Sequence, residues 1–347
     1  MSIYTLMKSF SFFLFLVIAV TGRAQDVHFS QMKFTPMSVN PSLVGLNGKY
    51  NATVNYRNQW NSVADPFQTL GASFDMKFNE SRRNGSFLAL GVNFFHDEVG
   101  DIHMTSSNIS ANIAYHLRFN RQNTFGTGIQ IGYSQRGIGN INGAYESQYN
   151  GSSFDQSILS GENYSRTGVS YIDAGAGFVF NHNSLNSRTF NSSGYKLSIG
   201  VSVYHLNTPD YTYLVGGDND LDMRFTGFVQ SEFNLNSSDW SLMPAAYYQR
   251  QGSHQEFIFG TYIKYNIAKS SSLTSLKNGF SIAYGPFYRV GDAFVNKLLI
   301  SFKEYSLGIS YDLNVSSLTQ ASKGRGGFEL MFNYSLPENH QSRVRIH

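Results

Sequence analysis

Apolar and polar residues alternate along much of this chain with the period of a β-strand. In residues 109–119 every odd position is apolar, and Asn112 and His116 lie on the opposite face. Residues 50–57 and 70–78 show the same alternation. Because successive side chains of a strand point to opposite faces, these segments predict strands with one apolar and one polar face.

The same pattern, followed along the chain, predicts fourteen strands. They cover residues 48–57, 67–78, 86–95, 107–119, 125–135, 168–180, 195–205, 221–233, 240–249, 255–265, 279–289, 293–302, 305–313 and 327–336. Most of them reach the length of a tilted membrane strand, about 9 to 11 residues. An even number of antiparallel strands returns both ends to one side, so we expect both chain termini in the periplasm and the longest connection, 136–167, outside.

The composition favours a membrane barrel over a soluble sandwich, which would show the same alternation. Charged residues make up 14% of the 347 residues, against roughly 25% in an average soluble domain. Aromatic residues reach 15%, and the mean hydropathy of −0.26 is too low for a bundle of membrane helices. The predicted fold class is all-β, a transmembrane antiparallel β-barrel of about 14 strands with a short N-terminal plug or periplasmic segment. The barrel is expected in residues 48–336 and a periplasmic tail in 337–347.

The first 24 residues have the features of a secretory signal peptide. An apolar run, Ser9 to Val20, follows a basic residue, and the small residues Gly22 and Ala24 precede Gln25. An uncleaved anchor helix is the alternative, but it would need about 20 apolar residues. We therefore predict cleavage near Ala24/Gln25 and localisation in the bacterial outer membrane.

Residues 25–47 neither alternate nor have low complexity. Asn40 can cap a helical turn that has Pro41 at its first position, and Gly45 can end it. A frayed leader is one interpretation, but it would expose apolar residues such as Phe29 to water. The better prediction is an ordered N-terminal plug or periplasmic segment.

A search for catalytic and metal motifs finds none that is specific. The nine histidines have no ligand-like spacing, and the chain has no cysteine. His116 and the many serines form no recognisable catalytic arrangement. We therefore predict no enzyme activity, no metal and no cofactor. The small net charge gives no support for nucleic-acid binding either.

Several charged residues lie on the faces that would line the barrel. Unpaired charge in a narrow interior is costly, so we expect these residues to form pairs that fill the lumen. A wide, water-filled pore would instead leave them free to select solutes. They are Lys49, Arg57, Asp75, Lys77, Arg118, Arg224, Glu232, Arg289 and Glu329.

Motifs at both ends of the predicted mature chain resemble the PorP/SprF family of outer-membrane proteins of the Bacteroidetes type IX secretion system. The N-terminal motif is Gln25-Asp26-x-His28-Phe29-Ser30-Gln31, and a C-terminal motif is Gly308-Ile309-Ser310-Tyr311-Asp312. Ser42 departs from the family's usual alanine. The positions singled out as structural or partner-binding are His28, Phe29, Gln31, Pro36, Asn40, Pro41, Gly45, Tyr56, Arg57, Gln59, Trp60, Asp75, Arg325, Gly327 and Glu329.

This resemblance implies a function that composition and spacing do not reveal. Family members are non-enzymatic barrels of the type IX secretion and gliding machinery, which work with periplasmic ring and motor proteins or hold a large secreted adhesin. The resemblance implies that Asn40, Pro41 and Gly45 shape the plug and that Asp75 is an inward partner. A channel for nutrient or hydrophobic-solute uptake is the alternative, and a structural barrel that anchors a periplasmic partner also stays open.

Overall fold

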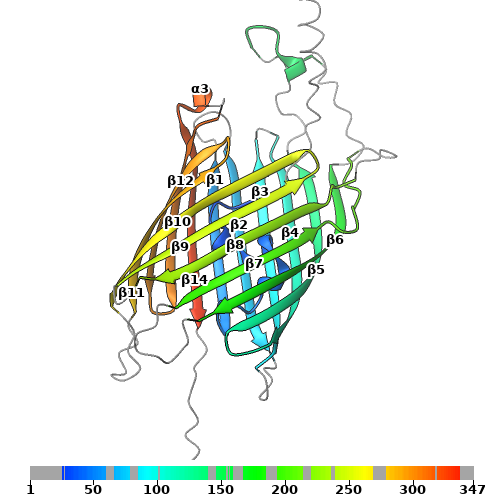
Figure 1. Ribbon diagram of the computed structural model, residues 1–347. Helices are drawn as coiled ribbons and strands as arrows, with labels where there is room; N and C mark the ends of the chain where they lie inside the picture. The colour runs from blue at the N-terminus through cyan, green and yellow to red at the C-terminus, as the bar shows by residue number, and fades with distance from the viewer. Residues whose placement is uncertain are drawn as a thin grey trace, which may run out of the picture.

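Fourteen antiparallel strands form a closed barrel within the described part of the computed structural model (Figure 1). The structure describes residues 26, 28–59, 66–78, 85–100, 102–139, 146–153, 155, 157–158, 167–184, 194–213, 220–235, 239–268, 279–316 and 319–336. The strands are β1 (Tyr50–Gln59), β2 (Phe67–Phe78), β3 (Phe87–Val99), β4 (Met104–Arg118), β5 (Asn123–Ile138), β6 (Gly168–Asn183), β7 (Tyr195–Tyr204), β8 (Arg224–Asn234), β9 (Trp240–Gln251), β10 (His254–Ala268), β11 (Phe280–Arg289), β12 (Ala293–Phe302), β13 (Tyr305–Asn314) and β14 (Arg325–Leu336). The predicted fold class is confirmed.

Each strand pairs with its neighbours in sequence, and β1 pairs with β14 to close the barrel. Some strands extend beyond the predicted limits. The predicted end of the third strand is residue 95, but β3 pairs with β4 as far as Val99 opposite Met104. Its outward positions there, His96 and Glu98, are polar, so the alternation stops before the strand does. The ladder continues beyond the apolar belt, where lipid no longer requires apolar side chains.

The two ends of the barrel are distinguished by where the sheet begins and ends. We call the end with Tyr50 and Leu336 proximal, because β1 starts and β14 stops there, and the opposite end distal. The described N-terminal segment does not start at the proximal end. Asp26 lies at the distal end, where its amide donates to Gln251 and its carboxylate contacts His205.

The two chain ends lie outside the described residues, so the expectation that both lie on one side stays a prediction, but the described N-terminal segment starts at the distal end. This segment passes through the lumen from the distal end to the start of β1, rather than lying beneath the barrel (Figure 1). The predicted signal peptide, residues 1–24, and the predicted tail, 337–347, lie outside the described residues.

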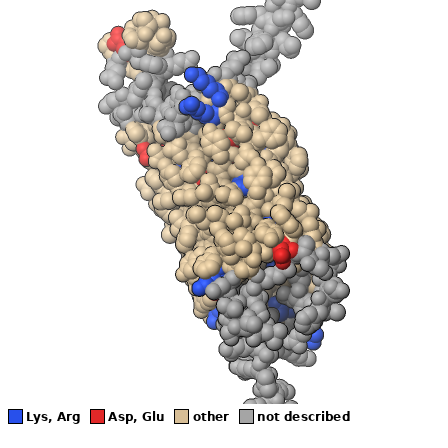
Figure 2. Space-filling model, turned by 90° about the vertical axis from the view of Figure 1, so that its left-hand side faces the viewer, with Lys and Arg blue, Asp and Glu red and all other residues tan. Residues whose placement is uncertain are grey.

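Large apolar side chains cover the outer wall, as the alternation predicts. Phe74, Ile113 and Ile131 are 46%, 48% and 62% exposed, whereas Asp75 and Asn112, one position away from the first two, are buried. The side of the barrel in Figure 2 has few charged residues between its two ends. This arrangement is typical of a sheet with lipid outside and a polar interior.

The N-terminal segment fills the middle of the lumen with three short helical turns. These turns are η1 (Met32–Phe34), α2 (Pro36–Val39) and η2 (Pro41–Leu43). Two further turns, η3 (Glu146–Gln148) and α3 (Thr319–Ser322), lie between strands. Among the described residues, no helix is both long and apolar enough to cross a membrane.

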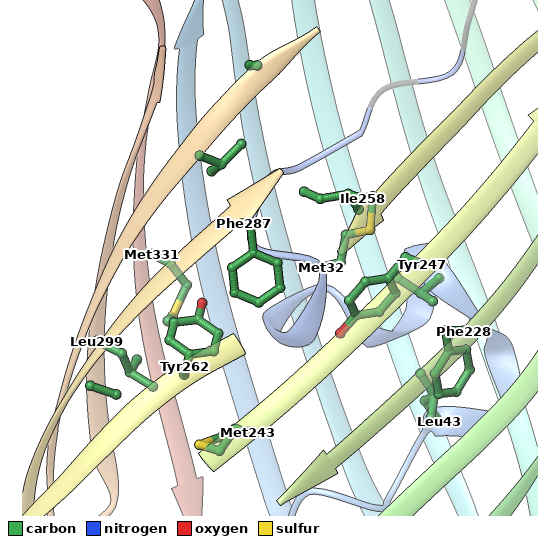
Figure 3. Packing of buried hydrophobic residues seen from close by; sticks show 14 of the residues in the cluster. Met32, Leu43, Phe228, Met243, Tyr247, Ile258, Tyr262, Phe287, Leu299 and Met331 are labelled. Atoms are coloured by element: carbon green, nitrogen blue, oxygen red, sulfur yellow. The ribbon is translucent and has the colours of Figure 1, made fainter. Parts of the chain in front are cut away.

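One side of the lumen is packed with apolar side chains (Figure 3). Met32 and Leu43 of the N-terminal segment belong to the same buried cluster as Tyr247, Ile258 and Phe287 of the wall. Burying an aliphatic or aromatic side chain stabilises a fold by about 1.5 to 3 kcal/mol. The N-terminal segment therefore provides part of the barrel's core, and we call residues 26–47 the plug.

Candidate functional site

A buried serine near the start of the plug is the centre of a polar network. The Ser30 hydroxyl accepts hydrogen bonds from Arg57 Nη1 and Arg289 Nη2, each at 2.7 Å, and donates to Asp312 at 3.1 Å. A hydroxyl has one proton and two lone pairs, so all of its hydrogen-bonding capacity is used. The backbone of the plug is also bound: Glu329 accepts from the amides of Ser30 and Gln31 at 2.7 and 3.1 Å.

The charges around Ser30 form a group of ion pairs that we call the central cluster. Its members are Ser30, Arg57, Glu256, Arg289, Lys297, Asp312 and Glu329. Arg57 lies 3.2 Å from Asp312 and 3.3 Å from Glu329, with side-chain exposures of 1%, 4% and 2%. Lys297 donates to the Ser30 carbonyl at 2.6 Å. A further carboxylate, the more exposed Asp292, lies 2.8 Å from Arg289 Nη1. Arg57, Asp312 and Glu329 are buried together, so loss of one of these charges would leave another uncompensated.

The plug is held a second time through Asn40, midway along its length. The amide nitrogen of Asn40 donates to the carbonyls of Phe178 and Val201 on β6 and β7, at 3.0 and 2.9 Å. Its amide oxygen accepts from the amide and hydroxyl of Ser42, which caps the η2 turn. Pro41 occupies the first position of that turn. The cap predicted from the sequence is confirmed, and the same side chain also fastens the plug to the wall.

A third attachment lies near the proximal end. Gly45 has a φ of +78°, and its amide donates to Asp75 at 2.8 Å. A β-carbon at this position would collide with Ala89, so only glycine fits. His116, which is fully buried, bonds the Val44 carbonyl through Nε2 at 2.8 Å and must carry its proton there. These two contacts fix the end of the plug against β2 and β4.

A separate ionic group holds the distal end of the plug, and we call it the distal cluster: Asp26, Arg136, Asp173, His205 and Arg224. His205 lies between two carboxylates, 2.5 Å from Asp26 and 2.9 Å from Asp173. Burial opposes its charge, but the two carboxylates outweigh burial and raise the pKa of His205 to about 9. Burial also opposes ionisation of Asp26, but His205, Arg224 and Arg136 hold its pKa well below the usual range.

A cavity of about 730 Å³ lies between the plug and the distal end of the barrel, and we call it the vestibule. Its lining includes Met37 and Ser38 of the plug and distal strand residues such as Asp97 and Arg136. The Arg136 guanidinium lies 4.6 Å from the centre of the Tyr211 ring. Its Nε has no hydrogen-bond partner within the described residues. The vestibule is therefore a large polar space next to the plug that could receive another molecule.

The structure brings most of the predicted site residues together around the plug. His28 lies 3.2 Å from Glu256, Phe29 packs near Gly71, and Pro36 begins α2. The positions whose side chain or backbone holds the plug are Gln31, Asn40, Pro41, Gly45, Arg57, Asp75 and Glu329. Whether any of them binds a partner stays a prediction.

The remaining motif positions lie elsewhere. Tyr56 faces outward and is 37% exposed, and Arg325 is exposed at the start of β14. Gln59 lines the vestibule beside Gly327. Trp60 lies outside the described residues.

Sequence reasoning missed several members of the two clusters. Asp312 could have been found, because the inward positions of β13 alternate from Ser306 to Asn314 and Asp312 is one of them. Lys297 could not have been found in this way, because its inward neighbours Val295 and Leu299 are apolar and the inner face of β12 shows no polar pattern. His205 lies at the end of the predicted strand 195–205, but β7 ends at Tyr204 and His205 has a φ of +57°, so its contacts do not follow from the alternation. In the described residues, no group of three or more potential ligands could hold a metal ion.

The barrel and its filled lumen define the class as a plugged barrel of the outer-membrane type. The fold is similar to the toluene transporter TbuX of Ralstonia pickettii, with a TM-score of 0.50 and 11% identity over 91% of this chain and 96% of that chain. A deletion mutant of the monoaromatic hydrocarbon channel TodX gives a TM-score of 0.49 and 8% identity over 86% and 92%. At such identities the likeness concerns the fold alone.

The family described as "Type IX secretion system membrane protein PorP/SprF" matches residues 21–334. The chain belongs to this family, which confirms the resemblance found in the motifs. No curated protein matches the chain in a sequence search. The family and the structural neighbours are secretion or channel barrels rather than enzymes.

Proposed function

We propose that this protein is a non-enzymatic component of the type IX secretion or gliding machinery that supports export or surface attachment of cargo proteins. Membership of the family supports the machinery. The observation that carries the proposal is the plug, which four separate polar attachments hold inside the lumen. A lumen closed by the protein's own chain favours a scaffold or docking role over free solute flow.

The partners would follow from this role. Periplasmic ring or motor proteins would contact the proximal end, and exported protein would meet the distal end with its vestibule. This orientation requires that the strand ends Tyr50 and Leu336 face the periplasm. The same orientation agrees with removal of the leader near Ala24/Gln25, because Asp26, which lies just after the predicted cleavage site, is held at the distal end, away from the periplasm. The motif residues of the plug would then act by keeping it in place.

A second candidate is uptake of a nutrient or hydrophobic solute. The vestibule of about 730 Å³ favours it, because a small molecule could enter that space. Single-channel conductance of the purified protein separates the two functions. A plugged secretion component should be nearly silent, whereas a solute channel should show conductance that an added substrate changes.

Gene deletion followed by an inventory of surface and secreted proteins tests the proposal. We expect particular exported proteins to be lost or no longer retained, and the wild-type gene to restore them. A gene with residues 26–45 replaced by a flexible linker should not restore them, although the outward control Ile131→Leu should. An unchanged inventory together with reduced uptake of a solute would support the alternative. A linker variant that fails to assemble would indicate that the plug is needed for folding.

A further inference from the structure

Three lysines gather inside the proximal half of the lumen, around one carboxylate. Lys196 of β7 and Lys264 of β10 lie on the inner face of the barrel, and Lys33 belongs to the η1 turn of the plug. The Glu232 carboxylate of β8 is 3.9 Å from Lys196 Nζ and 3.2 Å from Lys264 Nζ. Lys33 also attracts this carboxylate. We call Lys33, Lys196 and Lys264 the lysine cluster.

The lysine cluster has more positive charge than its described neighbours neutralise. Three ammonium groups share one carboxylate, and no second carboxylate of the described residues forms an ion pair with them. The side chains of Lys196 and Lys264 are 49% and 26% exposed, so water reaches them. Lys196 lies at the start of β7, which is at the proximal end of the barrel. The cluster therefore presents an excess of positive charge to the proximal opening of the lumen.

Bases across the lumen enlarge this positive field. Lys49, Lys77 and Arg118 lie near the proximal ends of β1, β2 and β4, on the inner face of the wall. Asp75 shares that face, but it already accepts a hydrogen bond from the Gly45 amide at 2.8 Å. Among the described residues that face this part of the lumen, bases thus outnumber acids. A field of one sign at the mouth of a lumen attracts groups of the opposite charge.

The outer wall at the level of the lysine cluster is aromatic and uncharged. On the outward side, Lys196, Glu232 and Lys264 each have an aromatic residue next to them in the sequence. These residues are Tyr195, Phe233 and Tyr265, with exposures of 38%, 41% and 39%. Aromatic side chains form girdles where a barrel wall crosses the membrane interface. The wall therefore separates the lysines from lipid headgroups, so an anionic lipid does not account for the excess charge.

We propose that the lysine cluster binds an acidic segment of a periplasmic partner protein, which enters the proximal opening of the lumen. Its carboxylates would supply the negative charge that Glu232 alone does not provide, and the positive field would steer the segment into the opening. Lys33 would bring the partner into direct contact with the plug, close in sequence to Ser30 of the central cluster. The periplasmic location of the partner rests on the proposed function, whereas the need for carboxylates rests on the cluster itself.

Binding of a short fluorescent polyglutamate peptide to the purified protein tests the chemistry of the site. The wild type should bind the peptide, and added salt should weaken binding, because salt screens exposed charges. Lys196→Gln together with Lys264→Gln should weaken binding about tenfold, and Glu232→Gln should strengthen it by removing the competing carboxylate. The control Lys323→Gln with Arg325→Gln removes two exposed charges at the distal end and should bind like the wild type. Failure of the wild type to bind, or equal losses in the cluster and control variants, would overturn the proposal.

A photo-crosslinking residue in living cells tests the partner. Benzoylphenylalanine in place of Lys196 or of Lys264 should give a product in which mass spectrometry finds a periplasmic protein, joined through a segment rich in Asp and Glu. The outward neighbours Tyr195 and Tyr265 are the matched control positions and should not give this product. A neutral or basic segment, or no product from either lysine position, would contradict the proposal.

Gene deletion separates this inference from the proposed function. If the inventory of exported proteins is unchanged but an acidic segment is cross-linked, the secretion role is wrong and the binding site is supported. If exported proteins are lost but polyglutamate does not bind and no acidic segment is cross-linked, the secretion role is supported and the lysine cluster is not its docking site.

Discussion

The two ionic clusters that hold the plug differ in their access to water. The central cluster lies deep in the lumen, and the side chains of Arg57, Asp312 and Glu329 are only 1–4% exposed. The distal cluster lines the vestibule, where the side chains of His205 and Asp26 are 8% and 14% exposed. The Ser30 hydroxyl of the central cluster is saturated, but each cluster also contains an arginine Nε without a hydrogen-bond partner in the described residues, Arg57 in the central cluster and Arg136 in the distal cluster.

This difference separates a structural role from one that can respond to the surroundings. Charges removed from water are stabilised only by one another, so removal of any one charge of the central cluster should strongly destabilise the protein. Charges next to a water-filled cavity can be rehydrated or can exchange partners, so removal of one charge of the distal cluster should destabilise the protein only slightly. We therefore expect the central cluster to set whether the plug stays in place and the distal cluster to set how tightly its outer end is held.

The largest effect should come from Arg57→Met. This change leaves Asp312 and Glu329 short of one positive charge in a buried site, which typically costs about 3 to 5 kcal/mol. The free energy of unfolding in lipid vesicles should fall by that amount, and conductance should rise as the plug loosens. Arg325→Met, at an exposed arginine of β14, should change stability by less than about 0.5 kcal/mol. A similar loss of unfolding free energy in both variants would contradict the conclusion that the buried charges of the central cluster hold the plug in place.

Asn40 should have an intermediate effect, because it binds the wall without using charge. Asn40→Ala removes the cap of η2 and two hydrogen bonds to the wall, and we expect a loss of about 1 to 3 kcal/mol. Asn40→Asp keeps the cap but cannot donate to the carbonyls of Phe178 and Val201. If unfolding measurements show that Asn40→Asp is as stable as the wild type, the wall contacts contribute nothing.

A smaller effect is expected from Arg224→Gln in the distal cluster. Arg224 lies 3.5 Å from Asp26 and donates to the Ser38 carbonyl at 3.2 Å. Because water from the vestibule can replace part of these contacts, the cost should be about 1 kcal/mol. Protease treatment should cut the start of the plug more readily, while conductance should stay as low as in the wild type. A conductance increase like that of Arg57→Met would remove the distinction between the two clusters.

The smallest effect should be the pH dependence of the distal cluster. The pKa of His205 is raised from 6.5 to about 9. Its contribution to the free energy of unfolding is therefore complete below about pH 6.5 and is lost as the pH rises through about 9. The lowered pKa of Asp26 gives a contribution that is present above about pH 3.8 and lost in acid. NMR titration should find the His205 ring still protonated at pH 7.5, and protease sensitivity of the plug should rise toward pH 9. His205→Gln should abolish the rise.

The alternation along the chain was sufficient to predict the barrel, because lipid favours apolar residues at the outward positions of a membrane strand. It therefore located β4 and β14 closely and placed Arg57, Asp75 and Glu329 on the inner face. The cap at Asn40 was predictable for a similar reason, since Asn-Pro has a local geometry that needs no distant partner.

Contacts between distant residues were decided only by the tertiary structure. Nothing in the sequence indicates that Ser30 meets Arg289 and Asp312, which are more than 250 positions away, because closure of the barrel and the path of the plug bring them together. The direction of the plug also depends on which end of the lumen has partners for Asp26. The sequence by itself thus determined the wall, through a periodic constraint from the lipid, and the tertiary structure decided how the interior is filled and paired.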